Sequence, residues 1–69
     1  MRIQIASDIV RDDLFAELYS DDELWAEVSQ KTGRVLVFPR DDGTPWRFTV
    51  KDMLNVLTDA IARLELKEI

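Results

Sequence analysis

Two segments of this chain repeat nearly the same pattern, LFAEL at 14–18 and LWAEV at 24–28, with YSDDE between them. Apolar and polar residues alternate in both segments, which is typical of β-strands that bury one face. Folding the chain about Ser20–Glu23 aligns the two apolar rows, as the register of a hairpin requires. The repeat therefore predicts a β-hairpin over residues 14–30.

The rival interpretation of this segment is a helical hairpin. Ala, Glu and Leu favour helices, and Ser20 with Glu23 resembles a capping box. In the β-hairpin, which we favour, one row of side chains meets a helix and the other row is uncovered. The first row is Leu14, Ala16, Leu18, Leu24, Ala26 and Val28, and the second is Phe15, Glu17, Tyr19, Trp25, Glu27 and Ser29.

The rest of the chain predicts further strands and one helix. The N-terminal run MRIQIA alternates, and RVLVF is rich in β-branched residues and stops at Pro39. Apolar positions from Val50 to about Leu66 follow helical spacing, and Thr49 is the expected N-cap. We therefore predict one α+β domain over residues 1–69, an antiparallel β-meander of three to five strands with one C-terminal helix packed on one face.

The turn at Lys31–Gly33 decides on which face of the sheet the side chains of the RVLVF strand lie. A two-residue loop places Val35 and Val37 on the helix side, and a three-residue loop with Gly33 in the left-handed conformation places them on the other face. We favour the valines on the helix side.

The small size and the missing residue types narrow the function. Sixty-nine residues bury only about 60% of the unfolded surface, so such a domain is marginally stable alone. The chain has no cysteine and no histidine, which excludes disulfides and makes zinc sites and the common catalytic triads implausible. Oligomerisation is the remaining common way to stabilise so small a domain, so we expect a homo-oligomer, most simply a dimer.

Charge is concentrated in the middle of the chain. The net charge is −5, and the segment from Asp12 to Gly33 contains seven acids and one base. Nucleic-acid binding needs clustered Lys and Arg, so we expect no nucleic-acid partner. No apolar run approaches the roughly 20 residues that a membrane-spanning helix needs, so we expect a cytoplasmic protein with no membrane partner.

Several motifs of the chain resemble a family of short, uncharacterised bacterial proteins. The resemblance covers nearly the whole chain and implies a β-meander with a closing helix, without implying an activity. It rests on an A-E-(I/L)-Y…A-E-(I/V)-S-Q hairpin, an aromatic residue followed by Pro, and a P-W-x-F step before the C-terminal amphipathic helix. The matching positions are Ala16, Glu17, Leu18, Tyr19, Ala26, Glu27, Val28, Ser29, Gln30, Phe38, Pro39, Pro45, Trp46 and Phe48.

No motif favours an enzyme. Glu17 and Glu27 could be neighbours on one sheet face, but acid–base work needs a water-excluding cleft that so short a chain can hardly enclose. The run Asp41–Gly43 reads as a turn rather than a calcium loop, because no distal bidentate Glu follows. We predict no catalytic residue, no metal and no cofactor.

The aromatic residues of the hairpin are the strongest functional signal. Phe15, Tyr19 and Trp25 either form an exposed patch that marks an interface, or they are core beneath the helix. We expect Trp46 and Phe48 to close the end of the core. The predicted function is a non-enzymatic module that self-associates through an aromatic sheet face or an edge, with interface candidates Phe15, Glu17, Tyr19, Trp25 and Glu27. The alternative is an acidic inhibitor or immunity-type protein that binds a basic partner through Asp21, Asp22 and Glu23.

Overall fold

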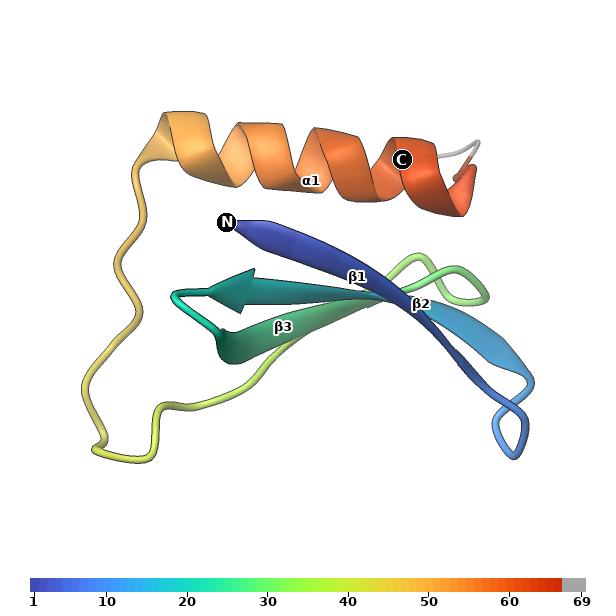
Figure 1. The fold of residues 1–69 in the computed structure, drawn as a ribbon, viewed down its shortest axis with the longest axis horizontal. Helices are drawn as coiled ribbons and strands as arrows, with labels where there is room; N and C mark the ends of the chain where they lie inside the picture. The colour runs from blue at the N-terminus through green and yellow to red at the C-terminus, as the bar shows by residue number, and fades with distance from the viewer. Residues whose placement is uncertain (67–69) are drawn as a thin grey trace.

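The computed structural model describes residues 1–66 and contains a four-stranded antiparallel sheet with one helix (Figure 1). The strands follow one another in the sheet in chain order, so the predicted meander with a C-terminal helix is confirmed. The elements are β1 (Arg2–Asp8), β2 (Asp13–Ser20), β3 (Glu23–Ser29), β4 (Val35–Val37) and α1 (Val50–Leu64).

The segment predicted as a β-hairpin is β2 and β3, and the helical alternative is wrong. Asp21 and Asp22 form the two-residue turn with φ angles of 49° and 64°. Two successive positive φ angles define a type I′ turn, whose twist matches that of the strands it joins. Most L-residues avoid this conformation, but the short side chain of Asp tolerates it.

The register of the third strand pair places the two valines of β4 on the helix side of the sheet. Val35 pairs with Val28, and Val37 pairs with Ala26. This orientation agrees with the favoured prediction, although the connection runs through a longer turn than two residues. Gly33 adopts a φ of 69° in this turn, a conformation that glycine reaches without a steric cost.

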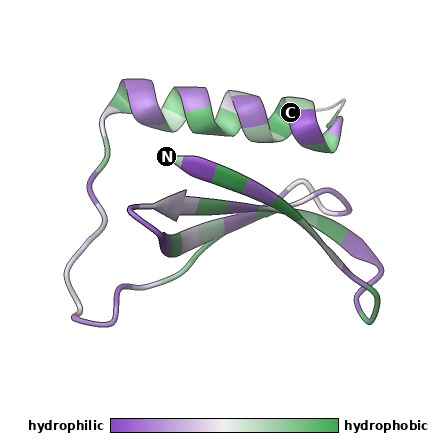
Figure 2. Ribbon diagram, viewed as in Figure 1, coloured by the Kyte–Doolittle hydropathy of each residue, from purple (hydrophilic) through white to green (hydrophobic). Residues whose placement is uncertain are grey.

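The helix begins where the sequence predicts. The Thr49 hydroxyl accepts a hydrogen bond of 3.0 Å from the backbone N–H of Asp52. The helix ends at Leu64, slightly earlier than predicted, because Glu65 turns left-handed with a φ of 55°. Hydrophobic and hydrophilic residues alternate along β1 and recur with helical spacing along α1 (Figure 2).

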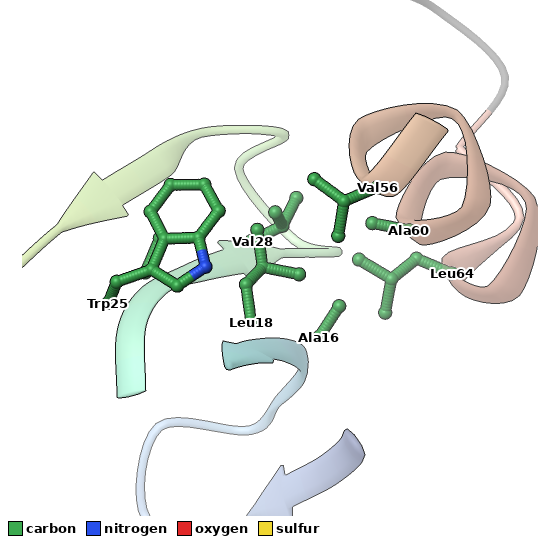
Figure 3. Packing of buried hydrophobic residues seen from close by; sticks show 8 residues of the cluster. Ala16, Leu18, Trp25, Val28, Val56, Ala60 and Leu64 are labelled. Carbon is green, nitrogen blue, oxygen red and sulfur yellow. The ribbon is translucent and has the colours of Figure 1, made fainter. Parts of the chain in front are cut away.

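The core lies between α1 and the sheet (Figure 3). Small residues on both sides allow the helix to approach closely, since Ala16, Ala26 and Ala60 are each fully buried. Trp46 and Phe48 pack against the edge of the core, which confirms their predicted role. The buried cluster contains Ala16, Leu18, Trp25, Ala26, Val28, Val56, Ala60 and Leu64.

Trp25 belongs to this core, which corrects the prediction that it shares the uncovered face with Phe15. The register between β2 and β3 shifts at Leu18/Tyr19, so that Leu18 pairs with Ala26 while Tyr19 pairs with Leu24. Trp25 is therefore the extra residue of a β-bulge, where simple alternation of faces is interrupted. Its ring is 2% exposed and lies 4.6 Å from the Phe48 ring.

The helix covers only part of the sheet. Figure 1 shows α1 above β1, and its packing contacts are with β1 and β2. Trp46 and Phe48 cover Trp25 on β3. The side chains of β4 are left outside, with Val35 46% and Val37 54% exposed although they point to the helix side.

Candidate interaction surface

Four of the five predicted interface residues do share the face of the sheet opposite the helix. Glu17 pairs with Glu27, and Phe15 pairs with Ser29, so these side chains project from the same side as Tyr19. The fifth, Trp25, is in the core on the other side. We call the face that bears the first four residues the open face.

Arg11 covers the aromatic part of the open face. Its guanidinium lies 4.1 Å from the centre of the Phe15 ring and pairs with Asp8 at 2.8 Å and with Glu27 at 3.5 Å. Phe15 is consequently only 5% exposed. The hydrogen bond from Arg11 lowers the pKa of the Asp8 carboxyl below its ordinary value, which favours the ionised pair.

Tyr19 is covered in a similar way. The Arg2 guanidinium lies 4.1 Å from the centre of its ring and 3.6 Å from the Asp22 carboxylate. Since Phe15 is buried, Tyr19 is half-buried and Trp25 is in the core, the predicted exposed aromatic patch does not form. The open face presents arginines and carboxylates over its rings.

Glu17 and Glu27 are direct cross-strand neighbours, one of the arrangements that the sequence allowed. Like charges in this position repel each other, and the Arg11 ion pair with Glu27 reduces the repulsion. A shallow groove of about 400 Å³ runs beside Glu27 and is lined by residues that include Phe15, Arg34 and Leu36. The groove is open to solvent, and this arrangement resembles a charged sheet surface more than an acid–base site.

The alternative acidic surface lies at the tip of the β2–β3 hairpin. Asp21 and Asp22 form the turn itself, and Glu23 begins β3. Two of the three are paired within the chain, since Asp22 contacts Arg2 and Glu23 lies 3.9 Å from Arg40. Part of the acidic charge at this tip is therefore already neutralised by the protein's own arginines.

The most exposed apolar strand is β4, which was not among the predicted interface residues. Val35, Leu36 and Val37 are 46%, 54% and 54% exposed, and in the described part of the chain β4 is the edge strand that follows β3. The sequence predicted the strand but not its exposure. The β4 side chains are exposed because α1 packs on β1 and β2 and does not cover β4. The sequence of α1 does not show over which strands it packs.

Among residues 1–66, the outward backbone groups of β4 have no hydrogen-bond partner at this edge. The Arg34 carbonyl accepts from the Ser29 N–H, and the Phe38 N–H donates to the Trp25 carbonyl. Backbone groups alternate in direction along an antiparallel strand, so Val35 and Val37 direct their N–H and C=O groups away from β3. A strand with such groups and apolar side chains is a template for pairing with another strand.

A hydrogen-bond network fixes the turn that leads into β4. The Asp13 carboxylate accepts from the Ser29 hydroxyl and from the backbone N–H groups of Leu14 and Lys31, while the Ser29 hydroxyl accepts from the Thr32 N–H. Burial opposes the ionised form of Asp13, but these hydrogen bonds outweigh it and lower the pKa of the carboxyl. The network thus ties the turn that precedes β4 to the first residue of β2 and the last residue of β3.

Comparisons with protein-family models, curated proteins and solved structures found no match for this chain. Its resemblance to a family of short bacterial proteins therefore stays a prediction. Within residues 1–66, no helix is both long and apolar enough to cross a membrane. In the same part of the chain, no group of three or more acidic side chains gathers as a metal site would require.

Proposed function

We propose that this protein is a non-enzymatic protein–protein interaction module that self-associates through the edge strand β4. The observation that favours this function is the coincidence of exposed apolar side chains and outward-directed backbone groups on Val35–Val37. Of the two surfaces expected from the sequence, the edge is favoured over the aromatic face, because Arg11 and Arg2 cover Phe15 and Tyr19.

The expected free-energy gains of β4–β4 pairing are close to the cost of association, which predicts a weak dimer. Complete burial of a Val or Leu side chain contributes roughly 1.5–3 kcal/mol, and the three β4 side chains are about half exposed. Pairing two copies would cover the flank of each strand, and thus part of the exposed area of these six side chains, and would form new backbone hydrogen bonds worth about 1 kcal/mol each net. These gains oppose an association cost of about 4–15 kcal/mol, which predicts a reversible dimer with micromolar or weaker affinity.

The test is sedimentation of the wild-type protein and of Val37→Lys over a wide concentration range. We expect the wild type to dimerise and Val37→Lys to weaken dimerisation at least tenfold, because a charged lysine at an edge opposes strand pairing. The matched control is Leu54→Lys, which adds the same charge at another exposed apolar position, 60% exposed on α1. A wild type that stays monomeric at millimolar concentration, or equal dimerisation of all three proteins, would refute the proposal.

A further inference from the structure

We propose that the two copies pair β4 with β4 in antiparallel orientation, with the two-fold axis passing beside Leu36. This inference rests on the proposed function and specifies the partner, the register and the contacts. The result is a continuous eight-stranded sheet with both helices on the same side, since a two-fold axis perpendicular to the sheet keeps equivalent faces together.

The hydrogen-bonding groups of β4 select this register. Centring the pair on Leu36 sets Val35 opposite the partner's Val37, and the reverse pair follows by symmetry. Both residues direct their backbone groups outward, so the two pairs can exchange four hydrogen bonds.

The two neighbouring registers lose part of this ladder. Centring on Val37 sets Val35 opposite the partner's Pro39, which has no N–H to donate. Centring on Val35 sets Val37 opposite the partner's Gly33, whose N–H already donates to the Ser29 carbonyl at 2.9 Å. The register centred on Leu36 is therefore the one that uses the full set of outward groups.

Charge favours the antiparallel over the parallel orientation. Lys31 and Arg34 precede β4 and are exposed, and within residues 1–66 neither forms an ion pair. After β4 come Arg40, which pairs with Glu23 at 3.9 Å, and the exposed Asp41 and Asp42. Antiparallel pairing brings the basic end of one strand to the acidic residues after the other, whereas parallel pairing would bring the basic ends together. Complementary ends of this kind set orientation and register.

Single cysteines test the register, because the natural chain has none. In the proposed pair, Leu36 faces the partner's Leu36 at a non-hydrogen-bonded site, where Cα atoms are typically about 4.5 Å apart. That separation lies within the range of a disulfide. We expect Leu36→Cys to form covalent dimers under mild oxidation at least tenfold faster than Val35→Cys and Val37→Cys, which serve as matched controls.

Charge reversal gives an independent measurement of the orientation. We expect Lys31→Asp and Asp41→Lys each to weaken dimerisation several-fold in sedimentation, and the double variant to recover part of the loss. If the losses of the two single variants simply add in the double variant, the antiparallel contact between these two residues is contradicted.

The outcomes separate the register from the function. Fastest cross-linking at position 35 or 37 would overturn the register and leave self-association through β4 intact. Dimers in sedimentation that cross-link at none of the three positions would overturn both the register and the use of this edge. Monomers in sedimentation would overturn both proposals as well.

Discussion

The guanidinium of Arg11 lies 4.1 Å from the centre of the Phe15 ring and connects a loop residue to the middle of the open face. Arg11 also pairs with Asp8 and Glu27, so one side chain joins the β1–β2 loop to β3. The contact explains why an aromatic ring on the face opposite the helix is only 5% exposed. The open face is therefore covered by a cation and not by a second layer of structure.

Replacing Arg11 tests this covering role. Arg11→Ala is expected to expose Phe15, to lower the melting temperature and to increase binding of a hydrophobic dye. Arg11→Met should give an intermediate melting temperature, because its long side chain can still cover the ring without forming the ion pairs. Arg63→Ala, which removes an ion pair with Asp59 on the helix surface, is the control. A melting temperature of Arg11→Ala no lower than that of the control would contradict the prediction.

The bulge at Trp25 can be tested by comparing two neighbouring truncations. Trp25→Ala should cost about 3–5 kcal/mol of unfolding free energy, because it removes a fully buried ring, or it should unfold the domain outright. Leu24→Ala should cost about 1 kcal/mol, since Leu24 is only half-buried. Urea unfolding followed by circular dichroism provides both values. Simple alternation of faces predicts the larger loss of unfolding free energy for Leu24→Ala. That result would contradict the bulge at Trp25.

The type I′ turn at Asp21–Asp22 can be tested by comparing glycine with alanine at position 22. Asp22→Gly should increase the unfolding free energy by about 0.5–1 kcal/mol relative to Asp22→Ala, because glycine reaches a φ of 64° without strain. Both variants lose the same exposed contact with Arg2, so the comparison isolates the backbone. Thermal unfolding of the two variants gives the difference, and equal melting temperatures would show that the turn is not of this type.

The Asp13 network predicts how stability depends on pH. Hydrogen bonds lower the pKa of Asp13 in the folded state, so its contribution is complete above the unfolded pKa of about 3.9 and is lost as pH falls through the folded pKa. Asp13→Asn should therefore melt lower than the wild type at neutral pH and lose less stability below about pH 4. Ser29→Ala removes one donor and should behave between the two. Parallel pH profiles for all three proteins would contradict this assignment.

Much of the fold was predictable because local signals agree with one another. The repeat of alternating segments predicted β2 and β3, and the spacing of apolar residues predicted α1 with Thr49 at its N-cap. The repeat also allowed Glu17 and Glu27 to be neighbours on one sheet face, and the structure pairs them directly. Each of these features depends on residues that are close in sequence or related by a short connection.

The candidate surface was harder to predict, because its decisive features depend on tertiary contacts. Nothing in LWAEV marks an extra residue, so a period of two assigned Trp25 to the wrong face. Arg11 lies in a loop, and its fold back over Phe15 is visible only in three dimensions. The exposure of Val37 depends on how far α1 extends across the sheet, which the helical spacing does not determine.

The packing of Leu64 against Ala16 has a consequence for synthesis on the ribosome. The side chain of Leu64 is fully buried and belongs to the last turn of α1, yet it covers a strand near the beginning of the chain. The apolar side of the nascent hairpin remains exposed to solvent until that last turn has left the exit tunnel. Contacts so distant in sequence slow folding, so the newly made strands are open to chaperones and to association with other nascent chains until α1 has emerged.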